Sequence, residues 1–136
     1  MLKEEITVTV TEAELDAEYQ HLHHSKYCLL FEQGRTSLMK KAGLPLHAVI
    51  AEGLFPVVTQ LSVTYLREVT SGQYNISTAV SEIRWKVMVF EQLITDFRGK
   101  EIAQATVQCM ILKKSAGKAI AVPDGWKAKF DPSQAS

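Results

Sequence analysis

The chain has 136 residues, of which 46% are hydrophobic and 22% charged, and its 15 basic and 15 acidic side chains give a net charge of zero. This length predicts one domain with a sizeable buried core. The balanced charge provides no overall attraction to nucleic acid or to an anionic membrane, so we expect neither as a partner.

The N-terminal residues predict a strand and no export signal. Residues 5–10, EITVTV, alternate apolar and polar side chains, which is typical of a half-buried strand. The acidic start is unlike a signal peptide, and no apolar run reaches the roughly 20 residues needed to span a bilayer. Cys28 and Cys109 lie in apolar runs and indicate buried thiols, not a disulfide framework. We therefore expect a cytoplasmic protein.

From residue 23 to residue 42 the apolar spacing becomes helical. The apolar or small positions recur at steps of three and four, at Tyr27, Leu30, Phe31, Gly34, Leu38 and Ala42. The string KKAGLP is a helix end, with basic residues in the last turn, then Gly43 and then Pro45. Because Cys28 and Leu29 widen the apolar stripe, we expect this helix to be covered on several sides.

The pattern of the chain after the helix predicts only strands and the turns between them. We predict strands over 57–66, 74–80, 85–96 and 101–114, with the last two joined by a turn at FRGK. In the first of these strands the alternation predicts one face carrying Val57, Thr59, Leu61, Val63 and Tyr65. Residues 1–130 form a single predicted domain, and 131–136 a flexible tail.

This order of elements predicts an α+β fold, in which a curved antiparallel sheet wraps around one buried helix. Such a sheet has long edge strands. A homodimer or homotetramer can hide them by continuing the sheet from one copy to the next.

Three histidines, His21, His23 and His24, stand at the entrance to the predicted helix. Zinc takes three or four protein ligands, and no Cys or carboxylate falls at a usual motif spacing, so we expect no metal site. His21 has a suitable solution pKa for a general base. We favour a structural role, in which the imidazoles shape the turn before the helix. Asp16, taken alone, is typical of a turn or capping residue.

Several strings nevertheless occur together in an order that resembles the hotdog-fold acyl-CoA thioesterases, in the branch similar to 4-hydroxybenzoyl-CoA thioesterase. They are Asp16, QHLHH at 20–24, Tyr27, FEQGR at 31–35, AGLP at 42–45, TYLREVTSGQ at 64–73, SEIRWKV at 81–87 and AIAVPDGW at 119–126. The resemblance implies the hotdog fold, a five-stranded antiparallel sheet wrapped around one long central helix. Two departures are clear: Asp16 lies five residues before His21 where the family has four, and Gln20 replaces a glycine.

The resemblance also implies a function, hydrolysis of a small aromatic or short- to medium-chain acyl-CoA thioester. Asp16 would act as base or nucleophile, and the backbone amide of His24 would hold the oxyanion at the helix N-terminus. Tyr27 would contact the substrate, while Arg84 and Lys86 would bind the phosphates of coenzyme A. A second basic cluster of lysines is a weaker candidate for that role, at Lys113, Lys114 and Lys118. No cofactor is implied beyond the coenzyme A of the substrate.

Other readings stay open at this point. Glu32 could be a catalytic base on the helix, although a structural pair with Arg35 at i+3 is the simpler explanation. The acyl pocket could be lined by Tyr27, Phe55 and Val57, which are equally good core residues. Within the fold a hydro-lyase is an alternative, but no recognisable dehydratase string is present. An acyl-carrier-protein thioesterase would need an acidic partner to meet residues 113–118, and a non-catalytic acyl-CoA-binding protein is the third alternative.

Overall fold

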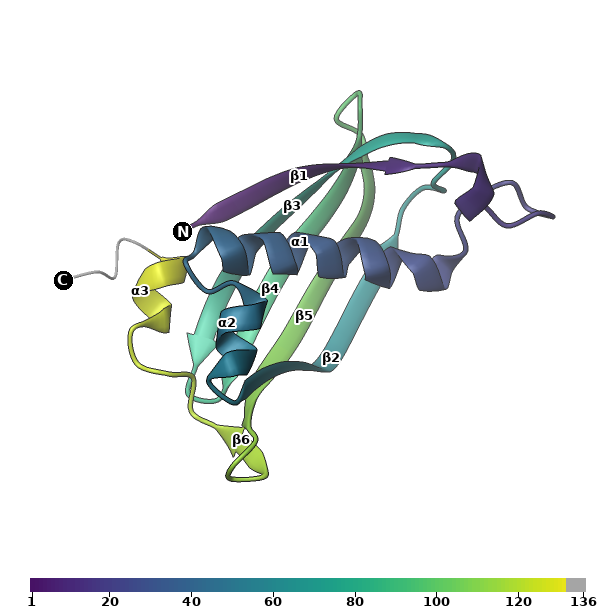
Figure 1. Cartoon of the computed structure of the whole chain (residues 1–136). Helices are drawn as coiled ribbons and strands as arrows, with labels where there is room; N and C mark the ends of the chain where they lie inside the picture. Colours follow the sequence, from purple (N-terminus) through teal and green to yellow (C-terminus); the bar gives the residue numbers. More distant parts are fainter. Residues whose placement is uncertain (132–136) are drawn as a thin grey trace.

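The computed structural model describes residues 1–131 and contains one sheet, one long helix and several short helical turns (Figure 1). In chain order the elements are β1 (Lys3–Val10), η1 (Glu12–Glu14), η2 (His24–Lys26), α1 (Tyr27–Lys41), α2 (Leu46–Ala51), β2 (Leu54–Tyr65), β3 (Gly72–Arg84), β4 (Val87–Asp96), β5 (Glu101–Lys113), β6 (Lys118–Ile120) and α3 (Trp126–Phe130).

The sheet is antiparallel with the strand order β1-β3-β4-β5-β2, and α1 lies along one of its faces (Figure 1). This arrangement confirms the α+β class and the hotdog fold. The sheet has six strands where five were predicted, because the three-residue β6 pairs with the end of β5. The short helices α2 and α3 were not predicted, since five or six residues are too few to display a helical period.

The centre of α1 approaches the sheet closely at Gly34. A Cβ atom placed there would lie 2.5 Å from the hydroxyl of Thr78 and 2.9 Å from the amide nitrogen of Gln92. Gln92 is buried and donates hydrogen bonds to the Phe31 carbonyl at 2.8 Å and to Thr78 at 2.9 Å, while Arg35 donates to its amide oxygen at 3.1 Å. A glycine at this step therefore lets a polar network connect the helix backbone to β3 and β4.

A β-bulge in β2 overturns the predicted alternation of that strand. Val58 is opposite Cys109, but Gln60, not Thr59, is opposite Gln108. The extra residue reverses the sides of the strand, so that Val58 and Leu61, rather than Val57 and Leu61, share the helix-facing side. The prediction that Val57 shares a face with Leu61 is wrong for this reason.

The entrance to α1 also differs in detail from expectation. The helix begins at Tyr27, and the preceding residues form η2, a single 3₁₀ turn from His24 to Lys26. Short 3₁₀ turns are common at helix ends. Of the predicted tail at 131–136, only Asp131 lies among the described residues, where its carboxylate is 3.9 Å from the N-terminal amine. Across residues 1–131, no helix combines the length and the apolar character that a membrane span requires.

Candidate active site

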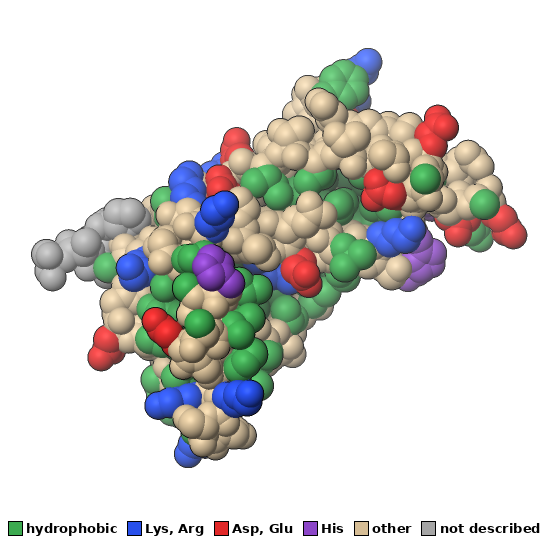
Figure 2. Space-filling view, in the orientation of Figure 1, with side chains coloured by type: hydrophobic (Ala, Val, Ile, Leu, Met, Phe, Trp, Pro, Cys, Tyr) green, Lys and Arg blue, Asp and Glu red, His purple; other side chains and the backbone are tan. Residues whose placement is uncertain are grey.

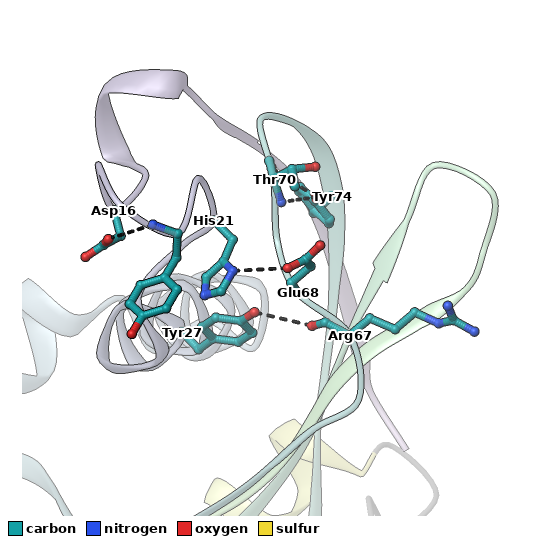
Figure 3. A network of polar contacts seen from close by, with 8 residues as sticks. Asp16, His21, Tyr27, Arg67, Glu68, Thr70 and Tyr74 are labelled. Atoms are coloured by element: carbon teal, nitrogen blue, oxygen red, sulfur yellow. Dashed lines mark hydrogen bonds and ion pairs between the residues drawn. The ribbon is translucent and has the colours of Figure 1, made fainter.

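A pocket of about 580 Å³ opens at the N-terminal end of α1, which we call the helix-entrance pocket. Its walls come from the loop before η2, the first turn of α1, the end of β2 and the loop after β2. It brings together Asp16, His24 and Tyr27, three of the five residues predicted for the site; Figure 3 shows Asp16 and Tyr27 on the helix-entrance side. The lining also includes Tyr19, His21, His23, Tyr65, Arg67 and Glu68.

Asp16 is fixed by the loop that contains it. Its Oδ1 atom accepts hydrogen bonds from the amides of Glu18 at 2.9 Å and Tyr19 at 3.1 Å. The Asp16 backbone closes the same loop by bonding to His21 and Gln20, and Gln20, which the resemblance aligns with a glycine, adopts a φ of 62°. The loop thus accommodates its additional residue while Asp16 still lines the pocket.

These hydrogen bonds also set the charge of Asp16. The amides of Tyr19 and Glu18 lower the pKa of its carboxyl, with smaller contributions from His23 and His21. The side chain is therefore an anion at neutral pH. Within residues 1–131 no protein group donates a hydrogen bond to its second oxygen, Oδ2. That oxygen can accept a proton from water or attack a carbon atom.

His24 contributes a backbone donor at the first position of η2. The carbonyl of His24 accepts from the Tyr65 hydroxyl at 3.0 Å and from the Tyr27 amide, so the turn is held at two points. Its own N–H donates to no group in the described part of the chain. An N–H without an intrahelical partner is the usual state of a helix start, and it favours negative charge nearby.

The histidine side chains are occupied with local contacts. His23 accepts a hydrogen bond from the Ser25 amide at 3.2 Å, as an N-cap does, and its ring lies 4.2 Å from that of His24. His21 makes a contact of 3.1 Å with the carboxylate of Glu68. Among the described residues no three His, Cys, Asp or Glu side chains form a group able to hold a metal ion.

Tyr27 and Tyr65 form one wall of the pocket. Their rings meet edge to face at 4.9 Å, and burial raises the pKa of both hydroxyls. The Tyr27 hydroxyl donates to the Arg67 carbonyl at 3.3 Å, which leaves the Arg67 side chain pointing away from Tyr27 (Figure 3). The loop after β2 is thereby attached to the helix entrance.

The loop after β2 is fixed from several directions. Tyr74 both accepts from the Thr70 amide and donates to the Thr70 carbonyl, each at 3.0 Å. The carbonyl of Ile102 accepts from the amides of Leu66 and Arg67, at 2.9 and 3.1 Å. These bonds hold the backbone of the loop in place without a ligand.

Arg84 and Lys86 lie away from this pocket in the same protomer. They flank Trp85 in the turn between β3 and β4, whereas the pocket is near the opposite end of β3. The strand β3 contains 13 residues from Gly72 to Arg84, which corresponds to roughly 40 Å of extended chain. Arg84 is already 2.8 Å from Glu82, and the Lys86 ammonium lies 4.6 Å from the centre of the Trp85 ring. Their role in binding coenzyme A stays a prediction.

Glu32 and Arg35 line a different cavity, of about 250 Å³, between α1, α2 and the β2 side of the sheet. We call it the apolar groove, because most of its walls are Met39, Leu46, Pro56, Val58, Met88 and Phe90. Phe55 and Val57 line neither this groove nor the helix-entrance pocket. The bulge in β2 and the alternation of the strand place their neighbours Pro56 and Val58 there instead.

Tyr65, Arg67 and Glu68 also line the pocket, and none of the three was predicted as a site residue. All three lie in the string TYLREV, which was noted only as a family string. A tyrosine at the end of a strand and a following Arg-Glu pair are ordinary surface features, so the residues alone carry no signal. Their importance depends on the register of β2 beside β5, where Tyr65 is opposite Ala103.

Comparison with solved structures confirms the architecture. A dihydroxynaphthoyl-CoA (DHNA-CoA) thioesterase from Staphylococcus aureus matches with a TM-score of 0.89 and 20% identity, covering 99% of this chain and 93% of that one. A hypothetical protein from the same organism in complex with CoA has a TM-score of 0.84 and 20% identity, with coverages of 95% and 83%. A probable thioesterase from Escherichia coli has a TM-score of 0.79 and 22% identity, with coverages of 93% and 96%.

The sequence comparison assigns the family. No curated protein sequence matches the chain significantly. The model of the thioesterase-like superfamily matches residues 10–130, which include every residue of the helix-entrance pocket. This match and the fold confirm the predicted resemblance and, with it, the expectation of a thioester hydrolase: the chain belongs to the thioesterase-like superfamily.

Proposed function

We propose that this protein hydrolyses acyl-CoA thioesters at the helix-entrance pocket. The observation that carries the proposal is the presence in one pocket of an ionised carboxylate, Asp16, and an unoccupied backbone donor, the N–H of His24. Thioester hydrolysis needs these two groups, one to activate water and one to hold the oxyanion. A structural neighbour from Staphylococcus aureus was solved in complex with CoA, which supports coenzyme A as the thiol carrier.

The chemical steps follow from these two groups. Oδ2 of Asp16 takes a proton from water as the water oxygen bonds to the thioester carbon, and the carbonyl oxygen becomes an anion facing the His24 N–H. The carbon–sulfur bond then breaks, and the proton on Asp16 passes to the departing thiolate. If Asp16 instead attacks the carbon itself, the same N–H holds the oxyanion while the carbon–sulfur bond breaks and the thiolate leaves. Water then hydrolyses the resulting anhydride, which releases the acyl group as a carboxylic acid, regenerates the Asp16 carboxylate and supplies the proton that the thiolate takes up.

A homodimer through the β2 edge is part of the proposal. β2 is a twelve-residue edge strand without a charged side chain, and its helix-facing residues Val58, Leu61 and Tyr65 are 40–48% exposed. Uncharged long edges of this kind invite pairing with another strand. Antiparallel pairing of two β2 edges is isologous and closes after two copies.

This pairing would also complete the site. The Tyr65 end of β2 borders the helix-entrance pocket, and the Leu54 end borders the apolar groove. Antiparallel pairing therefore places the groove of the second copy beside the pocket of the first. An apolar groove next to the reacting carbon suits an aromatic or medium-chain acyl group.

The proposal is tested by measuring thiol release from a panel of aromatic and aliphatic acyl-CoAs and from the same acyl groups on acyl carrier protein. We expect turnover of at least one acyl-CoA, with aromatic or medium chains preferred over acetyl-CoA. If only the carrier-protein substrates are hydrolysed, the thiol carrier is acyl carrier protein and not coenzyme A. Binding of acyl-CoA without turnover of either class would make the protein a non-catalytic binder.

A further inference from the structure

A second polar pocket, of about 390 Å³, adjoins the helix-entrance pocket and shares Arg67 and Glu68 with it. We call it the hairpin pocket, because its far side is the turn that joins β4 to β5. That turn contributes Asp96, Phe97, Arg98 and Lys100. Figure 2 shows hydrophobic and basic side chains together at the tip of this hairpin, which projects from the top of the molecule in Figure 1.

The hairpin pocket holds three cations that form no salt bridge within the described part of the chain, although Asp96 interacts electrostatically with Arg98 and Lys100. Arg67, Arg98 and Lys100 are exposed, and in residues 1–131 none of them is within salt-bridge distance of a carboxylate. Of the two acids in the pocket, Glu68 contacts His21 at 3.1 Å. The three cations outnumber the two carboxylates of the pocket, so this concave surface carries a net positive charge that attracts a polyanion.

Asp96, the other acid, organises the turn. Its Oδ1 accepts from the backbone amides of Arg98 at 2.8 Å and Lys100 at 2.9 Å, and Gly99 takes the φ of 81° that closes the turn. The two basic side chains are thus presented by a fixed backbone. Substituting these side chains leaves the hydrogen bonds from the backbone amides to Asp96 in place.

An aromatic ring completes the arrangement. Phe97 is 79% exposed, although an exposed phenylalanine loses the hydrophobic free energy of burial. The Arg98 guanidinium lies 5.2 Å from the centre of its ring. An exposed ring beside arginine is the combination on which nucleobases stack, since stacking and cation–π attraction act together.

The distance between the two pockets suits one ligand. Tyr65 of the helix-entrance pocket is opposite Ala103 on β5. From Ala103 the chain reaches Lys100 in three residues, or roughly 10 Å of extended strand. The main chain of a pantetheine arm has about 13 bonds, about as many as the backbone of four residues. When extended, it therefore spans roughly 15 Å. A thioester in the first pocket can therefore carry its nucleotide in the second.

We propose that the hairpin pocket binds the adenosine 3′,5′-bisphosphate end of coenzyme A, with phosphates on Arg67, Arg98 and Lys100 and the adenine stacked on Phe97. The inference rests on the proposed acyl-CoA hydrolysis and assigns its nucleotide subsite within one protomer. It differs from the sequence prediction, which placed the phosphates on Arg84 and Lys86. Within one protomer those two side chains lie near the opposite end of β3 from the helix-entrance pocket.

The test compares an acyl-CoA with the matching acyl-pantetheine, which has the same thioester and arm but no nucleotide. In an Arg98→Gln/Lys100→Gln variant we expect KM for acyl-CoA to rise about tenfold or more, the scale for lost bonds to a charged group. KM for acyl-pantetheine should not change. Phe97→Ala should raise KM for acyl-CoA about fivefold or more, again without effect on acyl-pantetheine.

The matched control is Lys127→Ala/Lys129→Ala, which removes two exposed cations from α3 and should leave both substrates unaffected. An equal loss with both substrates, or no loss with either, would overturn the assignment. The assignment would also be overturned if the Arg84→Ala/Lys86→Ala variant were the only one to show a raised KM for acyl-CoA. Impairment confined to an acyl-carrier-protein substrate would overturn it in favour of an acidic protein docking on the same cations.

Calorimetry with adenosine 3′,5′-bisphosphate separates this inference from the proposed hydrolysis. If the wild-type protein cleaves no acyl-CoA but binds the bisphosphate, and the Arg98→Gln/Lys100→Gln variant binds it about tenfold more weakly, the subsite stands and the hydrolysis proposal fails. If the variant binds the bisphosphate as tightly as wild type, the subsite is refuted whatever the activity.

Discussion

Replacing His24 by proline deletes the hydrogen of its backbone N–H, the proposed oxyanion donor, while the backbone can keep its course. Proline fits the first residue of a helical turn, where no N–H bond is needed and φ is near −65°. The preceding residue, His23, has φ −61° and ψ 140°, the extended conformation that proline requires before it. The His24 carbonyl can still accept from Tyr65.

The expected magnitudes follow from these contacts. Within the described chain the lost N–H makes no hydrogen bond, so the free energy of unfolding should change by less than about 0.5 kcal/mol. Loss of one oxyanion donor should lower kcat by about 10²–10³-fold, equivalent to about 2.7–4 kcal/mol. The matched variant His24→Ala removes the imidazole and keeps the N–H, so its kcat should stay close to that of wild type.

The assay is steady-state thioester hydrolysis, with unfolding in urea measured on the same samples. If His24→Pro folds normally and retains the kcat of His24→Ala, the backbone donor has no part in catalysis. If both variants lose activity equally while remaining folded, the imidazole acts and the backbone assignment is wrong.

Three further outcomes test the fold, the charge of the site and the assembly. Gly34→Ala should lower the free energy of unfolding, measured in urea, by about 2 kcal/mol, because the new Cβ meets Thr78. This value is the upper end of the overpacking cost, about 3 kcal/mol, less roughly 1 kcal/mol gained in helix propensity. Unchanged stability would refute this packing. Hydrogen bonds from the Tyr19 and Glu18 amides lower the pKa of the Asp16 carboxyl, so the ionised form persists below its ordinary titration range and kcat/KM should lack an acid limb between about pH 5 and 7. A limb near pH 6.5, the ordinary histidine value, would point to a histidine base instead. Leu61→Asp should shift the protein from dimer to monomer in sedimentation velocity, and a variant that remains dimeric would exclude the β2 interface.

The fold was predictable because its signals are local and repeated. The helical spacing from Tyr27 to Leu38 and the strand alternation on either side specify one helix that packs its apolar side against one sheet. The start of α1 was placed four residues early, since the 3₁₀ turn at His24–Lys26 has no distinct pattern. The bulge at Thr59 was invisible, because inserting one residue changes the facing of a strand without changing its composition.

For the candidate site, only the residues that lie in strings resembling the family were correctly predicted to come together. Asp16, His24 and Tyr27 come together as expected because they lie within twelve residues of chain and share the helix entrance. The basic residues could not be placed in this way. Arg84 and Arg98 look alike in sequence, but β3 and β4 carry them to opposite ends of the sheet, and only the topology decides which is near the pocket.

The Asp16 carboxylate is the proposed base or nucleophile for thioester cleavage, so Asp16→Asn is the variant to measure first. Asparagine keeps an oxygen that accepts from the amides of Glu18 and Tyr19, so the loop and the stability should be preserved. With an acyl-CoA that wild type hydrolyses, we predict that kcat falls by about a hundredfold or more, while Asp124→Asn, an exposed control, retains full activity. A folded Asp16→Asn protein with wild-type kcat would exclude Asp16 as the base or nucleophile, and Glu32 would become the carboxylate to test next.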